Sequence, residues 1–283
     1  MMNVFMQLKK ENFFSHNEQL IADFILEHPD QVLNMNTHQL SQQCYVSVAT
    51  IYRLCEKLGL TGYSELKLKL SQSIHEYMYD EDFDFDFPVK KYQTHYEIMS
   101  KLKEDYDKTV QSTFQLFSLD QLRLAVNALY KAKHIDIYTS AGNIYFAQNF
   151  KFQMQEIGIN VNVPVEEYQQ RLSAAKSNKD HLAIIISFGG RNILSQILPQ
   201  ILKETQTPIL LISSYDYQMK GVKADYQLYM SSHENHYKKI SSFSTRLSIL
   251  YILDVLYTCY FELNYNENIE KKLKYYELIA KKW

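Results

Sequence analysis

The stretch that decides the fold is "CYVSVATIYRLCEKLGLTG", residues 44–62 of a chain of 283 residues. Its apolar side chains Ile51 and Leu54 are three residues apart, which is the spacing of one buried helical face. Ser47 is a favourable N-cap, and Gly59 is favourable just past the end of a helix. The stretch therefore predicts a short helix between these two residues.

Two more short helices are predicted before it, over 17–28 and 37–44. In "NEQLIADFILEHPDQVLN" the apolar residues recur at helical spacing and form one stripe. The apolar positions of residues 37–55 have the spacing of two short helices that meet at a steep angle and share a side with the preceding helix. This pattern indicates a helix-turn-helix.

The side of helix 47–57 that is opposite its apolar stripe has an unusual composition. Small or hydroxylated residues come first, then an aromatic ring and two cations, in the order Ser47, Ala49, Thr50, Tyr52, Arg53 and Lys57. Small residues allow close approach to a major groove, Thr can meet a base edge, and Arg pairs with guanine or phosphate. A three-helix module that binds another protein is the alternative interpretation.

Charge gives only weak support for DNA binding. The whole chain has a net charge of −2, and residues 1–77 contain six basic and eight acidic residues. Residues 53–69 hold four basic and two acidic side chains, so any attraction to phosphate must be local.

Residues 17–70 resemble the N-terminal domain of RpiR-type bacterial transcriptional regulators. The portion "VSVATIYRLCEKLGLTGYSELK" follows that family's Val-Ser-x-x-Thr-x-x-Arg-x-x-x-x-Leu-Gly-x-x-Gly-[Phe/Tyr]-x-Glu-Leu-Lys pattern. One departure is Tyr45, where a glycine is usual in the turn. The resemblance implies that the outward side chains face DNA, with Ser64 and Lys67 near its backbone.

An acidic segment separates two differently patterned regions. "DEDFDFDFPVKK" at 80–91 combines charge repulsion with a helix-breaking proline. We predict a helix-turn-helix domain over 1–77, an acidic linker over 78–95 and an effector-binding and dimerisation domain over 96–283.

After predicted helices at 96–117 and 119–132, short strands alternate with helices. The predicted strands are 134–139, 159–163, 182–187, 208–213 and 226–230. The run "LAIIIS" does not alternate in polarity, which suits a strand that is covered on both faces. The sequence therefore predicts an α/β domain with three layers and a mostly parallel sheet, behind an all-α N-terminal domain.

Two loops after predicted strands could bind an anion. "YTSAGNIY" places Ser140, Gly142 and Asn143 at a helix N-terminus, and the second loop contributes Ser187, Gly189, Gly190, Arg191 and Asn192. Loops at the carboxyl ends of parallel strands are where open α/β sheets bind ligands. The alternative is that each glycine serves only a structural turn.

Residues 110–265 resemble the SIS (sugar isomerase) domain that follows the helix-turn-helix in RpiR-type proteins. The family's second loop typically reads Ser-x-Ser-Gly-x-Thr, and its hydroxyls hold a sugar phosphate. Here Gly189 replaces the second serine and Asn192 the threonine, while Asn143 replaces a serine of the first loop. In that first loop, Thr139 and Ala141 stand at positions where the family usually has glycine. A changed sugar selectivity and a silent pocket both remain open, although Arg191 can contribute a charge-assisted bond if it turns inward.

Together these patterns predict a regulator of carbohydrate-metabolism genes that binds a double-stranded operator and a phosphosugar effector. Pairing of two recognition helices requires a homodimer or homotetramer. The rival is a phosphosugar isomerase or lyase, which needs a general base, and neither loop contains Glu or His. No cofactor and no metal are expected.

The remaining features have modest interpretations. His233 and His236 have the spacing of a metal pair but no third ligand, and Asp254 in the apolar run 247–263 is expected to pair with Arg246 or to face a subunit interface. Since that run is short and holds an acid, we expect a buried helix and no membrane span. Three cysteines without a C-x-x-C pair fit the reducing cytoplasm.

Overall fold

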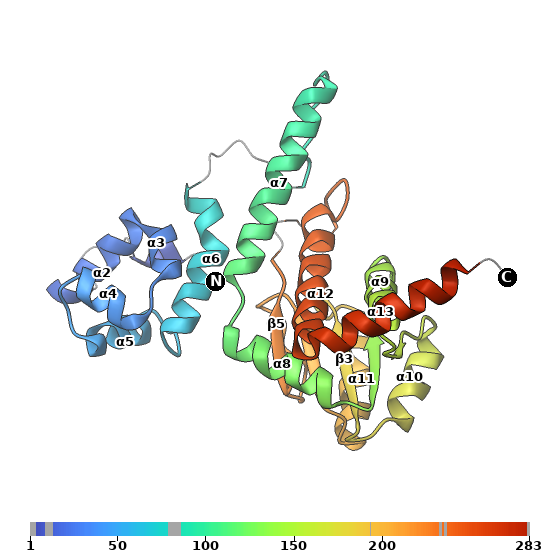
Figure 1. Ribbon diagram of the computed structural model, residues 1–283. Coiled ribbons are helices and arrows are strands. Elements are labelled where there is room, and N and C mark those ends of the chain that lie inside the picture. The colour runs from blue at the N-terminus through green and yellow to red at the C-terminus, as the bar shows by residue number, and fades with distance from the viewer. Residues whose placement is uncertain are drawn as a thin grey trace. The chain divides into compact units, whose positions relative to one another are not determined.

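The computed structural model describes residues 4–8, 14–78, 86–192, 194–231, 234 and 237–281 (Figure 1). The chain divides into two compact units, Met1–Asp84 and Phe85–Trp283. The centre of the predicted acidic linker, 79–85, lies outside the described residues, and so do His233 and His236.

The described part of the first unit is helical. Its helices are α1 (Val4–Leu8), α2 (His16–Glu27), α3 (Pro29–Asn34), α4 (Thr37–Gln43), α5 (Val48–Lys57) and α6 (Tyr63–Met78). The three predicted helices correspond to α2, α4 and α5. The structure adds a separate α3 because Pro29 starts a new helix at a position where its missing N–H costs nothing.

One apolar core holds this unit together. Its buried side chains come from each of these six helices, and the short α3 contributes Val32 and Leu33. The members without measurable exposure include Leu8, Ile21, Ile25, Leu40, Ile51, Leu54, Leu66 and Leu70. The predicted apolar stripe of helix 47–57 is therefore the side that faces the core.

The ends of α4 and α5 are closed by the same backbone motif. After α4, the Val46 N–H donates to the Ser41 carbonyl at 2.9 Å, with Tyr45 at φ 55°. After α5, the Leu60 N–H donates to the Cys55 carbonyl at 2.8 Å, with Gly59 at φ 74°. Such a Schellman motif requires a left-handed residue, which glycine adopts freely and tyrosine does not. Tyr45 thus keeps the geometry of the turn at a cost in strain.

The second unit is built on a parallel sheet of five strands in the order β2-β1-β3-β4-β5. The strands are β1 (His134–Tyr138), β2 (Val161–Asn162), β3 (His181–Ile186), β4 (Ile209–Ser213) and β5 (Tyr226–Tyr229). Each neighbouring pair is parallel, as the alternation of strands and helices predicts. All five predicted strands are present, within two residues at each end.

Helices cover both faces of the sheet (Figure 1). On one face, side chains of α8 (Leu119–Lys131), α9 (Asn143–Gln155) and α12 (Phe243–Leu263) pack against Ile184 and its same-face neighbours. On the other face, α10 (Glu167–Lys176) and α11 (Leu194–Glu204) pack against Ile185 and its neighbours. Burial on both faces explains the unbroken apolar run of β3.

Two further helices complete this unit. α7 (His95–Gln115) packs along α12, and α13 (Tyr265–Ala280) leaves the end of α12 at a bend of 105°. Among the described residues no single helix has the length and apolar character for a membrane crossing; only the bent pair α12–α13 passes that test, on length and composition alone.

The expected pairing of Asp254 with Arg246 is wrong. The Oδ1 atom of Asp254 accepts a hydrogen bond from Gln153 Nε2 at 2.9 Å, so it links α12 to α9. Arg246 instead donates from Nε to the Ser242 carbonyl, one turn back at the start of the same helix.

Candidate nucleic-acid interface and ligand pocket

The outer side of α5 is exposed over most of the predicted surface. Ser47, Ala49, Tyr52 and Arg53 are solvent-exposed or half-exposed, and Tyr52 retains 47% of its accessible area. Among the described residues no carboxylate pairs with Arg53. The helix thus presents small residues, a ring and an uncommitted cation to solvent.

The prediction that Thr50 belongs to this exposed surface needs correction. Thr50 lies four residues before Leu54, at the edge of the buried stripe, and only 8% of the residue is accessible. Its hydroxyl lies 2.9 Å from the Ser47 hydroxyl, and its backbone N–H donates to Ser47 Oγ at 3.2 Å. Thr50 therefore helps to build the N-cap of α5, where it holds Ser47 in place.

Lys57 is exposed but already engaged. Its Nζ lies 2.6 Å from Glu18 Oε2, a carboxylate in α2 of which 4% of the residue is accessible. Burial by itself raises the pKa of Glu18, yet hydrogen bonds from Lys57 and Ser15 bring it below its usual value. Glu18 also closes the capping box of α2 by accepting from the Ser15 N–H at 2.8 Å. Lys57 thereby ties α5 to the start of α2, a role that the spacing of the sequence does not reveal.

The two residues predicted near the DNA backbone lie in the first turns of α6. Ser64 is exposed, whereas Lys67 is partly buried and lies over the Tyr63 ring at 5.5 Å from its centroid. Burial lowers the pKa of Lys67. Tyr63 itself donates its hydroxyl to the carbonyls of Val32 and Met35, which anchors α6 to the end of α3.

In the second unit, the first predicted loop joins β1 to α9. Thr139 is buried and donates from Oγ1 to the Ile186 carbonyl at 2.9 Å, which ties the loop to β3. Ala141 adopts φ 53°, the left-handed conformation that the usual glycine would take there without strain. Gly142 offers no side chain to cap α9, and the N–H groups of Asn143, Ile144 and Tyr145 donate instead to the backbone carbonyls three residues earlier, at 3.2 to 3.3 Å.

The second predicted loop is held by hydroxyl groups. Ser187 Oγ accepts from the Gly190 N–H at 3.2 Å and from Ser195 Oγ at 3.0 Å. Gly190 adopts φ 64°, and a Cβ atom at this position would lie 1.8 Å from Cε2 of Tyr217. Tyr217 donates its hydroxyl to the Ser195 carbonyl at 3.0 Å. Glycine is thus required at 190 both by its backbone angle and by the ring above it.

A small pocket lies between the two loops, at the carboxyl ends of β1 and β3. It has a volume of about 10 Å³, which is room for about one water molecule. Of the predicted residues it brings together Ser140 and Asn192; Gly142, Asn143, Ser187, Gly189, Gly190 and Arg191 are not among its lining residues. The residues that line it are Tyr138, Thr139, Ser140, Gln170, Ile185, Ile186, Asn192, Ser195 and Leu198.

Gln170 is a site residue that the sequence analysis missed. Its residue exposure is 1%, and its Nε2 donates to the carbonyls of Thr139 and Val165 at 2.8 and 3.4 Å. These two acceptors fix the orientation of the amide, so Oε1 is left as an acceptor, and it has no partner among the described residues. A buried acceptor without a donor is costly unless a ligand or water supplies one. A signal in the sequence could have indicated this position. Polar or small residues recur at helical spacing along one buried face, at Gln170, Ser173, Ala174 and Ser177.

Arg191 and Glu234 are charged residues that do not line the pocket. Arg191 is exposed and lies over the Tyr237 ring, 5.3 Å from its centroid, so it does not turn inward. Glu234 is buried and accepts from the Ser244 N–H, Thr245 Oγ1 and Lys239 Nζ, at 2.5 to 3.1 Å. It therefore serves the N-terminus of α12. In the described part of the chain no group of three His, Cys, Asp or Glu is placed to hold a metal ion.

Two family models match the chain. The helix-turn-helix domain of the rpiR family matches residues 2–76, and the SIS domain matches residues 128–259. Together they place α5 and the pocket in separate domains of known type.

Two curated relatives cover most of the chain. An uncharacterised HTH-type transcriptional regulator of Caldanaerobacter subterraneus subsp. tengcongensis is 26% identical over 262 residues, which is 90% of this chain and 88% of the relative. One of Haemophilus influenzae is 24% identical over 243 residues, with 85% and 83% covered.

Solved structures share the fold. The Vibrio vulnificus NanR protein complexed with ManNAc-6P has a TM-score of 0.59 at 19% identity, with 98% of both chains covered. The sugar isomerase domain of an RpiR transcription factor from Sphaerobacter thermophilus has a TM-score of 0.56 at 12% identity, over 63% of this chain and 98% of that one.

Proposed function

Since the chain belongs to the RpiR family, with a helix-turn-helix domain followed by a SIS domain, we propose that it regulates carbohydrate-metabolism genes by binding an operator in the cytoplasm. The observation that carries this proposal is the exposed outer side of α5. Ser47 and Ala49 are small enough for close approach to a major groove, and Arg53 is free to meet guanine or phosphate. Thr50 is withdrawn from the proposed contact surface, and Lys57 contributes only if it leaves Glu18.

The proposed effector is a phosphorylated sugar bound between the two loops of the SIS domain. Support comes from Gln170, whose buried Oε1 can accept a hydrogen bond from a sugar hydroxyl or amide, and from the N-terminus of α9, where the helix dipole favours a phosphate. NanR, whose structure holds ManNAc-6P, is a neighbour of the same fold. ManNAc-6P is therefore the first candidate to test.

Because the pocket has room for about one water molecule, a sugar phosphate can enter only if the loops move apart. A ligand changes a conformational equilibrium only by binding one state better than the other. This opening is what the effector would stabilise. In a homodimer or homotetramer it would change the distance between two recognition helices, which engage successive major grooves about 34 Å apart.

The proposal assigns the SIS domain to binding and not to isomerisation. Proton transfer on a sugar needs a general base within hydrogen-bond reach. None of the residues that line the described pocket is Asp, Glu or His, and buried Glu234 accepts hydrogen bonds at the start of α12. Residues 232–233 and 235–236, beside Glu234, lie outside the described part of the chain.

The test of DNA binding begins with selection of duplex sequences from a random pool by the full chain. Affinity for the enriched sequence is then measured for wild type, Arg53→Ala and Arg123→Ala. Arg123 is an exposed arginine of the second unit, so its replacement removes one positive charge outside the helix-turn-helix domain. We expect Arg53→Ala to weaken binding by about 1–3 kcal/mol, or roughly 5- to 150-fold, and Arg123→Ala to leave it within about twofold.

Failure of the pool to yield an enriched duplex, or equal affinity of the Arg53 variant, would refute the recognition role of α5. The effector is tested separately by the shift of Tm with ManNAc-6P and with other hexose phosphates, against the unphosphorylated sugars. A specific ligand raises Tm by mass action. Gln170→Leu should remove the shift, and unchanged shifts in that variant would place the effector elsewhere.

A further inference from the structure

A second and larger pocket opens at the opposite edge of the same sheet. It lies at the amino ends of β1, β2 and β3, whereas the loop pocket lies at the carboxyl ends. Its volume is about 620 Å³, within the usual range for sites that bind small molecules. It is lined by parts of the chain for which neither the sequence nor the family resemblance predicts a function.

Two cations converge on this pocket from opposite faces of the sheet. Lys151 comes from α9 and Lys176 is the last residue of α10, and both line the pocket. Within the described ranges neither forms an ion pair or hydrogen bond, while Lys133 at the rim pairs with Asp180 at 2.9 Å. Two uncommitted ammonium groups around one hollow favour an anion.

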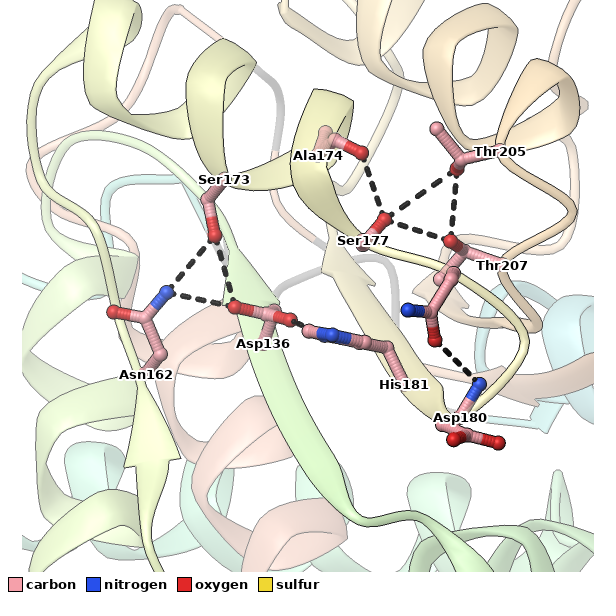
Figure 2. A network of polar contacts seen from close by, with 10 residues as sticks. Asp136, Asn162, Ser173, Ala174, Ser177, Asp180, His181, Thr205 and Thr207 are labelled. Atoms are coloured by element: carbon pink, nitrogen blue, oxygen red, sulfur yellow. Dashed lines mark hydrogen bonds and ion pairs between the residues drawn. The ribbon is translucent and has the colours of Figure 1, made fainter.

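The floor of the pocket is a fixed polar network, shown in Figure 2. Asp136 has 4% exposure, and its Oδ1 accepts from Asn162 Nδ2 at 2.7 Å and from Ser173 Oγ at 2.9 Å. Its Oδ2 lies 2.8 Å from Nδ1 of His181. Asn162 Nδ2 also donates to Ser173 Oγ at 2.9 Å. Asp136, the carboxylate among the described lining residues, is thus held by three hydrogen-bond partners and is fixed in place beneath the pocket.

This network decides which atom of His181 is available. A carboxylate accepts hydrogen bonds, so Nδ1 carries the proton and Nε2 has no partner in the described part of the molecule. Nε2 accepts from a hydroxyl when the ring is neutral and donates to an anion when it is charged. His134, the register partner of His181 on β1, lies against it at 4.5 Å between ring centroids. Both rings line the pocket together with the two lysines, and their planes are tilted by 33°.

From this arrangement we propose that the amino edge of the sheet binds a small, hydroxylated phosphomonoester. Lys151 and Lys176 hold the phosphate, and the imidazole of His181 meets a hydroxyl or phosphate oxygen. The concave shape and the spacing around one sheet edge suit a small molecule and not a duplex, which needs an extended surface. The site is independent of the proposed effector pocket at the carboxyl edge.

The experiment follows the ring Cε1–H signals of His134 and His181 by NMR in the full chain during titration with glycerol 3-phosphate. The His134 signal is assigned by its disappearance in the variant His134→Gln, which replaces an exposed side chain. We expect a saturable shift of the His181 signal that glycerol, which lacks the phosphate, does not produce. The double variant Lys151→Gln/Lys176→Gln should weaken binding roughly tenfold or more, since two charge-assisted hydrogen bonds are lost.

Two controls decide the location of binding. Lys220→Gln/Lys223→Gln removes two charges away from either pocket and should leave the affinity within about twofold. Gln170→Leu, in the loop pocket, should leave the His181 shift unchanged. Absence of a saturable shift, equal loss in both lysine double variants, or loss in Gln170→Leu would overturn the proposal. None of these outcomes depends on DNA binding.

Discussion

Replacement of single glycines by alanine separates the two reasons for which Gly190 is required. Gly142 has φ −62° and open space where a Cβ atom would lie, so Gly142→Ala meets neither obstacle. Gly221 has φ 70° with its nearest neighbour at an ordinary 3.7 Å, so Gly221→Ala meets the backbone obstacle alone. Gly190 has φ 64° and the Tyr217 ring at 1.8 Å, so Gly190→Ala meets both.

The expected costs follow from these geometries. A left-handed residue other than glycine costs about 1–2 kcal/mol, and the entropy that alanine removes from the unfolded chain returns about 0.4–1 kcal/mol. Gly142→Ala should therefore be neutral or slightly stabilising, and Gly221→Ala should cost about 1 kcal/mol. Forcing the Tyr217 ring aside adds about 1–3 kcal/mol, so Gly190→Ala should cost about 2–4 kcal/mol.

The assay is native-state hydrogen exchange of the β3 and β4 amides in the full chain, because it reports the stability of the second unit separately from the first. A double-mutant cycle with Tyr217→Ala isolates the contribution of the ring. In that background Gly190→Ala should cost no more than Gly221→Ala. If Gly190→Ala costs the same as Gly221→Ala in the wild-type background, the close approach of Tyr217 does not constrain this loop.

Three further predictions concern strain and charge. Tyr45→Gly should raise the stability of the first unit by up to about 1 kcal/mol, measured by urea unfolding, because φ 55° suits glycine and the ring is 95% exposed. The folded-state pKa of Glu18 is lowered, so its ionised side chain contributes to the free energy of unfolding above the usual carboxyl pKa. This contribution is lost as pH falls through the folded-state pKa. Lys57→Met should flatten this pH dependence in unfolding experiments between about pH 3 and 7. Burial, with a smaller contribution from nearby Glu234, raises the pKa of Asp105 to about 6. The free energy of unfolding should therefore fall as pH rises from about 4 to 6. Asp105→Asn should remove that slope and raise the free energy of unfolding by up to about 2 kcal/mol at about pH 7.5. A slope that persists in Asp105→Asn would assign it to another group.

The fold could be predicted because it depends on patterns that are local in sequence. The apolar stripe of residues 47–57 and the cap residues Ser47 and Gly59 define α5, and the unbroken apolar run of β3 indicates burial on both faces. The separation of α3 from α2 escapes such patterns because it depends on one proline at the first position of α3.

The roles of individual side chains are harder to predict from the sequence, because they depend on partners that the pattern of one helix does not contain. Lys57 has a regular surface position on α5, and only the approach of Glu18, 39 residues earlier, commits it to an ion pair. Thr50 lies four residues before buried Leu54, at the edge of the apolar stripe, and its hydroxyl meets that of the cap residue Ser47. Spacing along one helix fixes the direction of a side chain and says nothing about what another helix brings to meet it.

The altered second loop illustrates how a binding loop can change its side chains and keep its shape. Gly190 retains the left-handed turn, and Ser187 still accepts from the backbone of that turn, although the residues at 189 and 192 differ from the usual serine and threonine. The hydroxyl of Ser195 reaches Ser187 from the next helix and lines the pocket, so one hydroxyl has been supplied from a position that the family pattern does not include. The position of the loop therefore rests on its backbone, and under the proposed function its selectivity rests on the residues that surround it. Under that proposal, substitutions at 189 and 192 should alter which sugar phosphate binds more than they alter the stability of the fold.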